Sequence, residues 1–281
     1  MVKLMKNTIR IAVAQMEPLN GDIDANLSKV KEVVTSVNAE LYIFPELFLT
    51  GYLIEDLVFK LALDLDSKPI KELQQVSNKH RVGIVLGFPE RSSMGYLYNS
   101  ALAIDYRGNI YIYRKRHLPT FSSFSEGRWF KSYRGSFNPW LFGTIKVGIT
   151  ICYDIFFPEI FRKYMLNGVE LFINISAAPD TSIQLFHILS RARAIENSAY
   201  FVWVNTTGFI GGFGFGGASI AVDPLGNILY TLKYYEEDIR VVEINFDNIK
   251  KYRIERPLLR DVAFEDYYLL FKNALRYEER Q

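Results

Sequence analysis

The chain contains a single cysteine, Cys152, and this residue is its strongest candidate nucleophile. Cys152 follows the apolar run 147–151, which is typical of a buried strand, and precedes a helix predicted to open near 155–158. Backbone N–H groups and the helix N-terminus would then point towards the sulfur and favour the thiolate. A lone cysteine is more often an inert buried side chain. The strand-to-helix junction favours chemistry here, because α/β folds bind their ligands at that edge of the sheet.

A cysteine hydrolase needs a proton acceptor, which is usually histidine. The three histidines, His80, His117 and His187, stand in contexts that select none of them. Glu46 is a better candidate, because it directly follows the apolar run 41–44 and precedes a mostly apolar segment. An acid at this position is either exposed in a loop or held at the sheet edge. Held at the edge, it could exchange protons with a thiol.

Lys115 lies in the segment 111–119, which contains three adjacent cations. Strand alternation places Tyr111, Tyr113 and Lys115 on one face. Three adjacent cations usually form a solvated basic run. Here the run joins an apolar hairpin to an aromatic loop, 121–130, that contains Glu126. A cation at a strand end that faces a thiol could stabilise an oxyanion.

Buried strands and amphipathic helices alternate along the chain. In the first half, strands are predicted at 11–14, 41–44 and 82–87, and helices at 26–38 and 67–80. The second half repeats this order, with strands at 147–151, 171–175 and 200–204 and helices at 158–167 and 185–197. Continuous apolar strands indicate sheets that are covered on both faces.

Two similar short segments support a duplication of the first half of the chain in the second. Segments 103–110 and 221–228 both contain an Asp-x-x-Gly-Asn turn between alternating strands, which is a hairpin signal. Hairpin turns often share these residues, so the similarity of the two segments indicates a duplication only in combination with the matching order of strands and helices. Together they predict one α/β domain of two similar halves, in which each sheet carries helices on one face and packs on its partner sheet with the other. We expect a single domain over 1–281, with 247–281 as a C-terminal extension.

Composition excludes several classes of protein. The 281 residues are 49% hydrophobic and 23% charged, as in globular proteins, and the net charge of +2 gives no electrostatic reason to bind nucleic acid or a membrane surface. One cysteine excludes an intrachain disulfide, and together with three histidines it offers few soft metal ligands. No apolar run approaches the roughly 18 residues of a membrane span. We therefore expect a cytoplasmic protein without metal or cofactor.

Five segments in fixed order resemble the motifs of the nitrilase superfamily, the carbon–nitrogen hydrolases. They are FPELFLTGY at 44–52, YRKRHLP at 113–119, FSEGR at 124–128, GITICYDIFFPE at 148–159 and RARAIEN at 191–197. Each motif alone is weak, but all five in order are very specific. The resemblance runs from about residue 9 to about residue 246.

The resemblance implies a four-layer α-β-β-α sandwich with a catalytic triad of Glu46, Lys115 and Cys152. In this family pattern Glu46 takes the thiol proton and Cys152 attacks the amide carbon. Lys115 and the backbone N–H of Tyr153 would hold the oxyanion. Glu126 matches the second glutamate of the family, which would orient Lys115 or the substrate nitrogen.

Four neighbours of the triad are candidate substrate-binding residues: Tyr52, Phe124, Tyr153 and Ser176. Aromatic side chains at such positions are more often simply part of the core. Ser176 follows the strand predicted at 171–175, so its hydroxyl could reach a substrate, but a structural hydrogen bond is at least as common for such a residue.

The residues after the nucleophile bear on the reaction. Family members with true nitrilase activity usually resemble Cys-Trp-Glu, whereas this chain has Cys152-Tyr153-Asp154, which looks more like the amidase branches. Hydrolysis of a small amide, releasing ammonia or an amine, is therefore the first functional prediction. The segment 49–57 also resembles the glutaminase half of glutamine-dependent NAD synthetases, but the chain leaves no room for a nucleotide-adenylating module. A separate ammonia-supplying glutaminase subunit is the second hypothesis, and aliphatic nitrile hydrolysis is the third.

The glycine-rich segment 211–217 suggests an alternative hypothesis, a nucleotide-binding protein instead of a hydrolase. Such a loop could cradle a phosphate in a nucleotide-binding module. It precedes an apolar strand instead of a helix, so the helix N-terminus that would bind the phosphate is missing. We expect a flexible turn beside the pocket. A catalytically silent metabolite-binding protein is a further alternative, against which the intact triad argues.

The tail 254–281 mixes Arg and Glu with a cluster of apolar residues: Tyr267, Tyr268, Leu269, Leu270 and Phe271. An apolar cluster outside the duplicated core suggests a partner surface. Family resemblance implies a homodimer or larger homo-oligomer. The alternative is that the tail folds back on its own subunit.

Overall fold

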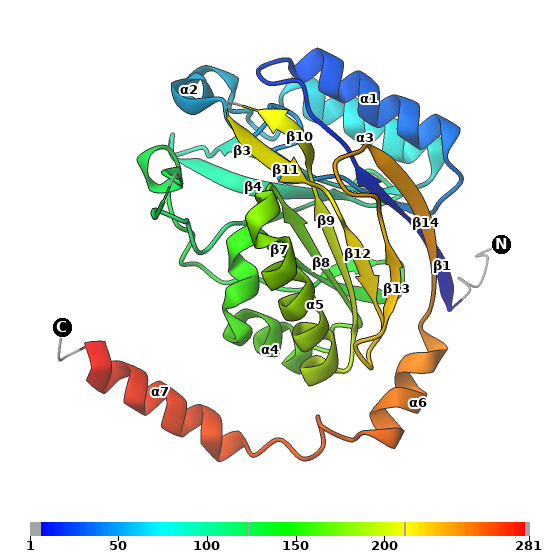
Figure 1. Cartoon of the computed structure of the whole chain (residues 1–281), viewed down its shortest axis with the longest axis vertical. Helices are drawn as coiled ribbons and strands as arrows, with labels where there is room; N and C mark the ends of the chain where they lie inside the picture. The colour runs from blue at the N-terminus through cyan, green and yellow to red at the C-terminus, as the bar shows by residue number, and fades with distance from the viewer. Residues whose placement is uncertain (1–6, 123, 211, 279–281) are drawn as a thin grey trace.

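The computed structural model describes residues 7–122, 124–210 and 212–278 (Figure 1). Two six-stranded sheets lie face to face, and helices cover their outer faces. The expected four-layer α-β-β-α sandwich is thereby confirmed. Within the described residues, no helix is long and apolar enough to cross a bilayer.

The first sheet has the strand order β14-β1-β2-β3-β4-β5. Its strands are β1 (Thr8–Gln15), β2 (Leu41–Ile43), β3 (Gly83–Arg91), β4 (Leu97–Ile104), β5 (Ile110–Arg114) and β14 (Asp238–Asn245). Strands β1, β2 and β3 are parallel neighbours, and the outer pairs are antiparallel. The helices of this half are α1 (Ile23–Ser36), α2 (Val58–Leu61) and α3 (Lys68–His80), with the short 3₁₀ helices η1 (Glu55–Leu57) and η2 (Glu126–Arg128).

The second sheet repeats this plan in the order β13-β12-β9-β8-β7-β6. Its strands are β6 (Trp140–Phe142), β7 (Ile145–Ile151), β8 (Leu171–Ser176), β9 (Tyr200–Asn205), β12 (Ile220–Val222) and β13 (Ile228–Thr231). Its helices are α4 (Pro158–Leu166) and α5 (Ile183–Asn197), with η3 (Cys152–Phe156) and η4 (Asp180–Ser182). A separate two-stranded hairpin, β10 (Thr207–Ile210) and β11 (Phe213–Gly216), follows β9.

The two predicted hairpins are the β4–β5 and β12–β13 connections, and their turns are built alike. Asp105 Oδ1 accepts hydrogen bonds from the backbone N–H groups of Arg107 and Asn109, at 2.8 and 2.9 Å. Asp223 Oδ1 accepts the equivalent bonds from Leu225 and Asn227, both at 2.9 Å. These repeated turns, in two sheets of corresponding order, confirm the two-half reading.

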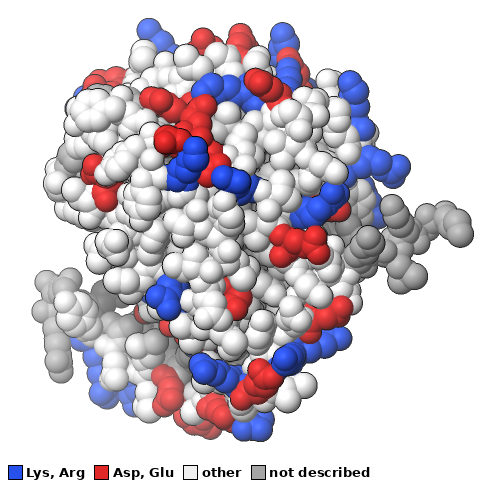
Figure 2. Space-filling model, turned by 45° about the vertical axis from the view of Figure 1, so that its right-hand side comes forward, with Lys and Arg blue, Asp and Glu red and all other residues white. Residues whose placement is uncertain are grey.

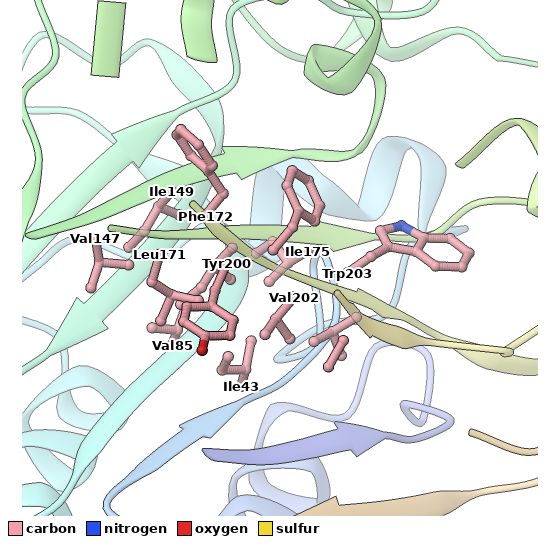
Figure 3. Packing of buried hydrophobic residues seen from close by; sticks show 14 of the residues in the cluster. Ile43, Val85, Val147, Ile149, Leu171, Phe172, Ile175, Tyr200, Val202 and Trp203 are labelled. Atoms are coloured by element: carbon pink, nitrogen blue, oxygen red, sulfur yellow. The ribbon is translucent and has the colours of Figure 1, made fainter. Parts of the chain in front are cut away.

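Apolar side chains fill the space between the sheets. Ile43 and Val85 of the first sheet belong to the same buried cluster as Val147, Leu171 and Val202 of the second (Figure 3). A second cluster lies between the first sheet and helices α1 and α3. Continuous apolar strands were expected for sheets covered on both faces, and all six residues of β8 and of β9 are buried.

Helix α1 begins earlier than its apolar periodicity predicts. The pattern places its start at residue 26, whereas the helix begins at Ile23. Asp22 caps it, because its carboxylate accepts a hydrogen bond of 2.9 Å from the backbone N–H of Ala25. The apolar residues of the first turn, Ile23 and Ala25, are only half-buried, so this turn adds little to the apolar pattern.

Helix α6 (Asp247–Glu255) packs on the sandwich through its buried Ile249, whereas α7 (Phe264–Glu278) extends away from it (Figure 1). The described part of the tail from α7 onwards does not fold back on the sandwich in this structure. Phe264, Tyr268 and Phe271 of α7 are 67%, 64% and 61% exposed. On the face shown in Figure 2, basic and acidic side chains are interspersed instead of gathering into one extended patch of a single sign.

Candidate active site

Glu46 lies in the turn that follows β2, and it is fully buried. Gly87 of β3 makes room for this turn, because a Cβ at Gly87 would lie 2.1 Å from the backbone nitrogen of Leu47. The backbone N–H of Gly87 donates a hydrogen bond of 3.0 Å to the carbonyl of Pro45. The turn is thus held directly against the neighbouring parallel strand, with its acid at the carboxyl edge of the sheet.

Lys115 follows β5 and is fully buried between two carboxylates. Its Nζ donates hydrogen bonds of 2.7 Å to Glu46 Oε1 and 2.6 Å to Glu126 Oε1. Burial alone lowers the pKa of Lys115, but the charges of Glu126 and Glu46 outweigh burial and hold that pKa above its ordinary value. The ammonium therefore stays protonated at neutral pH.

Cys152 lies at the sharp turn from β7 into η3 with a φ of +44°, which is uncommon for a residue other than glycine. A residue held in this region costs on the order of 1–3 kcal/mol and persists only where its surroundings fix it. Asn174 of β8 contributes to this, because its Nδ2 donates to the Cys152 carbonyl at 3.3 Å and to Thr150 Oγ1 at 2.9 Å.

The thiol of Cys152 corrects one expectation. The strand-to-helix junction suggested a stabilised thiolate, but burial raises the pKa of this thiol well above its ordinary value, and the adjacent Glu46 carboxylate raises it further. Lys115 acts in the opposite direction and does not offset these effects. The site thus holds a neutral thiol beside a buried carboxylate, which is an arrangement for removing the thiol proton during reaction instead of storing a thiolate.

Glu126 belongs to the same cluster. It is 3% exposed and accepts a hydrogen bond of 2.7 Å from Tyr52 Oη at the oxygen that also binds Lys115. Burial raises the pKa of Glu126 above its ordinary value, and Lys115 only partly offsets that effect. The structure therefore brings together all four residues that the sequence singled out for catalysis: Glu46, Lys115, Glu126 and Cys152.

The four candidate substrate-binding residues differ in position. Tyr52 contacts Phe124 edge to face with ring centroids 6.5 Å apart, so both lie beside Glu126. Tyr153 is half-buried directly after Cys152 and packs against Phe121. Ser176 is fully buried; its Oγ donates to Asn174 Oδ1 at 2.8 Å and accepts from Trp203 Nε1 at 2.9 Å. The Ser176 hydroxyl thus makes structural hydrogen bonds in this structure, which is the alternative given for it in the sequence analysis. A role of Ser176 in substrate binding stays a prediction.

Sequence reasoning did not single out the residues that hold these groups in place. Asn99 of β4 donates from Nδ2 to Glu46 Oε1 at 2.7 Å and to Glu126 Oε2 at 3.3 Å. The backbone N–H of Ala177 donates to Glu46 Oε2 at 2.8 Å. Asn99 and its neighbour Ser100 are the polar amide and hydroxyl residues of a mainly apolar buried strand, and this signal could have identified Asn99.

Asp154 is the second residue of this kind. It is fully buried, and its Oδ1 accepts hydrogen bonds of 3.0 Å from both the backbone nitrogen and Nδ1 of His117. Its Oδ2 accepts from Tyr113 Oη at 2.9 Å. His117 is therefore engaged with Asp154, while Nε2 of His187 bonds the carbonyl of Ala218 at 2.8 Å. Within the described residues, no histidine is hydrogen-bonded to Cys152.

A cavity of about 720 Å³ adjoins this cluster, a size typical of pockets for small ligands. The described residues that line it come from the loop after β5, from η4 and the residue before it, from the β10–β11 hairpin and from the β13–β14 connection: Phe121, Ser122, Phe124, Pro179, Asp180, Thr181, Ser182, Gly208, Phe209, Gly212, Phe213, Gly214 and Tyr235. Residues 212–214 of the glycine-rich segment line this cavity, but residues 213–216 form strand β11, paired with β10, instead of the flexible turn that was expected; Gly211 lies outside the described residues.

Relatives of known activity are similar over almost the whole chain. An (R)-stereoselective amidase from Pseudomonas sp. is 31% identical over 259 residues, which cover 90% of this chain and 91% of the amidase. A glutamine-dependent NAD(+) synthetase from Thermotoga maritima is 31% identical over 273 residues, which cover 92% of this chain and 46% of the synthetase. The chain thus spans less than half the length of that synthetase.

Solved structures agree on the fold. The crystal structure of a carbon-nitrogen hydrolase from Helicobacter pylori G27 superposes with a TM-score of 0.85 at 23% identity, covering 94% of this chain and 98% of the other. A mutant of the amidase from Nesterenkonia sp. AN1, in complex with butyramide, superposes with a TM-score of 0.75 at 25% identity, covering 91% and 97%. Residues 10–254 match the sequence pattern of the family described as carbon-nitrogen hydrolase. The chain therefore belongs to the carbon–nitrogen hydrolases of the nitrilase superfamily.

Proposed function

We propose that this protein hydrolyses the C–N bond of a small linear amide through a thioester on Cys152. The observation that carries the proposal is the convergence of a buried thiol, a buried carboxylate and a buried ammonium in one cluster. Lys115 Nζ lies 2.7 Å from Glu46 Oε1, and Glu46 is close enough to the Cys152 thiol to raise its pKa. An acid, a base and a nucleophile in one desolvated site are the groups that acyl transfer requires.

In the first half of the reaction, Glu46 takes the thiol proton while the Cys152 sulfur attacks the amide carbon. An S–C bond forms, and the electron pair of the C=O π bond moves onto oxygen. Lys115 Nζ and the backbone N–H of Tyr153 hold this oxyanion. As the oxyanion collapses, the C–N bond breaks, Glu46 gives its proton to the departing nitrogen, and ammonia or an amine leaves the thioester behind.

In the second half, Glu46 takes a proton from water, and the resulting hydroxide attacks the thioester carbon. The second oxyanion accepts hydrogen bonds from the same two donors, and its collapse breaks the S–C bond. The proton on Glu46 returns to the sulfur, and the carboxylic acid is released. Glu126 holds Lys115 in place throughout, with Tyr52 donating to the same Glu126 oxygen.

A glutaminase-type ammonia-supplying role is the second candidate. The 31% identity to a glutamine-dependent NAD(+) synthetase over 46% of that protein supports it. In this case the chemistry at Cys152 is the same, and the substrate is glutamine. Aliphatic nitrile hydrolysis is the third candidate and would share the thioester.

The test is an ammonia-release assay over butyramide, glutamine, a ureido acid and a dinitrile, with Cys152→Ala as the control. Release from an amide by the wild type, with loss of at least about 10³-fold in the variant, is the expected result. Turnover that survives in Cys152→Ala excludes the nucleophile, and turnover of glutamine alone selects the second candidate. Because the chain has one cysteine, an acyl adduct seen by intact mass after rapid quenching identifies the thioester directly.

A further inference from the structure

The cavity beside the catalytic cluster has aromatic walls and one carboxylate. Its aromatic residues are Phe121, Phe124, Phe209, Phe213 and Tyr235, and Asp180 is the only ionisable acid or base besides Tyr235 among the described residues that line it. Three of these rings are largely exposed: Phe209 at 74%, Tyr235 at 64% and Phe121 at 52%. Exposed aromatic side chains gathered around one cavity mark a ligand surface instead of a core.

Three of the cavity's lining residues connect it to neighbours of the proposed catalytic residues. Phe121 packs against Tyr153, the residue after Cys152, with ring centroids 5.3 Å apart. Phe124 packs against Tyr52, whose hydroxyl donates to Glu126. Asp180 follows Ala177, whose backbone N–H binds Glu46, by three residues. A molecule in the cavity therefore lies against residues that contact Tyr153 and Tyr52, the neighbours of Cys152 and Glu126.

The Asp180 carboxylate has no cationic partner of its own. Its Oδ1 accepts a hydrogen bond of 2.7 Å from the backbone N–H of Thr181. No Lys or Arg forms an ion pair with it within residues 7–122, 124–210 and 212–278. The charge of Asp180 is thus available to a ligand.

The glycine-rich hairpin sits close to this carboxylate. A Cβ at Gly214 would lie 3.0 Å from Asp180 Oδ2, and a Cβ at Gly216 would lie 3.3 Å from Asp180 Cβ. The glycines therefore let β11 approach Asp180 closely. A carboxylate at this distance repels a phosphate, so the hairpin is unsuited to the phosphate-binding role that its sequence suggested.

We propose that Asp180 and the rings around it form a cation subsite, so that the amide substrate carries a protonated amine at the end remote from its reacting carbonyl. This inference rests on the proposed amide hydrolysis and names its substrate class. An ammonium gains both from the carboxylate and from the faces of the aromatic rings, whereas a neutral alkyl end gains only from apolar contact.

The reach of the chain sets an order of magnitude for the length of a test substrate. Three residues span at most about 11 Å, so Asp180 lies no farther than that from the backbone of Ala177. A linear amide with about four methylenes between its carbonyl and its amine matches this order of length. The probe of choice is 5-aminopentanamide, and its neutral counterpart of equal length is hexanamide.

The turnover test compares kcat/KM for these two amides. We expect the wild type to prefer 5-aminopentanamide by at least about tenfold, and Asp180→Asn to bring the ratio close to one. The control Asp66→Asn removes an exposed carboxylate elsewhere and should keep the wild-type ratio. A ratio near one in the wild type, or a preference that persists in Asp180→Asn, overturns the cation subsite while leaving amide hydrolysis intact.

A binding test separates this inference from the proposed reaction. Calorimetric titration of 5-aminopentanamide into Cys152→Ala should show binding that weakens at least about tenfold when Asp180→Asn is added. If neither amide is hydrolysed by the wild type but this difference is found, the reaction proposal fails and the subsite stands. Equal affinity in both variants overturns the subsite whatever the turnover.

Discussion

Tyr113 Oη donates a hydrogen bond of 2.9 Å to Asp154 Oδ2, and this bond ties the strand that leads to Lys115 to the turn that carries Cys152. Asp154 also accepts from the backbone N–H groups of His117 at 3.0 Å and of Ile151 at 3.4 Å. One buried carboxylate thus joins the two sheets at the site. We expect this carboxylate to help fix the relative position of the Lys115 ammonium and the Cys152 thiol.

We expect Tyr113→Phe to lower kcat about tenfold, because the turn with Cys152 loses one of its anchors and the reacting groups lose alignment. The free energy of unfolding should fall by about 1–2 kcal/mol, since a buried acceptor loses a donor. Amide kinetics and urea unfolding measure the two effects. Tyr111→Phe is the matched control, because the Tyr111 hydroxyl in the same strand donates to the carbonyl of Asn138 instead. An unchanged kcat in Tyr113→Phe would mean that this bond serves stability alone.

Gly87→Ala tests the close packing beneath Glu46. The new methyl group would lie 2.1 Å from the Leu47 nitrogen and 2.7 Å from Glu46 Cα, so the turn must move. We expect a loss of about 1–3 kcal/mol in unfolding free energy and a fall of about 10²-fold in kcat, as expected for misplaced reacting groups.

Gly95→Ala serves as the comparison for this substitution. Apart from its two chain neighbours, no described residue comes within 4 Å of a Cβ built on Gly95, which has a φ of +79°. Its replacement should therefore lower the unfolding free energy by about 1 kcal/mol and leave kcat unchanged. Thermal unfolding and initial rates distinguish the pair. Equal activity losses in both variants would contradict the proposed packing role of Gly87.

Glu46→Gln should separate thiol reactivity from catalysis. Burial and then the Glu46 charge raise the pKa of Cys152, while Lys115 lowers it. Removing the charge of Glu46 therefore lowers the pKa of the thiol. The curve of alkylation rate by iodoacetamide against pH should then shift to lower pH than in the wild type. Amide turnover should fall at least about 10³-fold in the same variant, because the proton acceptor is lost.

The assay for this prediction follows loss of the free thiol between pH 6 and 10, and the single cysteine makes the readout specific. Glu40→Gln, which removes a carboxylate that pairs with Arg10 far from the cluster, is a suitable control and should not move the curve. A shift of the Glu46→Gln curve to higher pH would show that Glu46 does not act on the thiol through its charge.

Removal of residues 264–281 tests the predicted role of the C-terminal extension. Helix α7 exposes a row of apolar side chains, which we expect to pack against a second copy of the chain. Light scattering at micromolar concentration should show an oligomer for the full chain and a smaller species after truncation. The sandwich itself should keep its secondary structure by circular dichroism, because α7 contributes no buried residue to the core clusters. A full-length monomer would contradict the expected oligomer.

Much of the architecture could be predicted because it follows from local patterns. The apolar runs that became β7, β8 and β9 were each located to within two residues of their bounds, since continuous burial leaves a direct trace in composition. The Asp-x-x-Gly-Asn turns at Asp105 and Asp223 were likewise encoded locally. The start of α1 was misplaced, because Asp22 caps it through a hydrogen bond that periodicity does not report.

The candidate catalytic residues were chosen by type, by their place at strand ends and by motif order, all of which are properties of the sequence. Only the tertiary structure decided how these groups act on one another. Burial lowers the pKa of Lys115, and Lys115 stays protonated because the charges of Glu126 and Glu46, which lie 11 and 69 residues away along the chain, raise that pKa. The raised pKa of Cys152 reversed the expectation of a stable thiolate, because desolvation depends on everything packed around the sulfur. Asn99, Asp154 and Asp180 gained their proposed roles from neighbours distant in sequence, and no local pattern encodes such proximity.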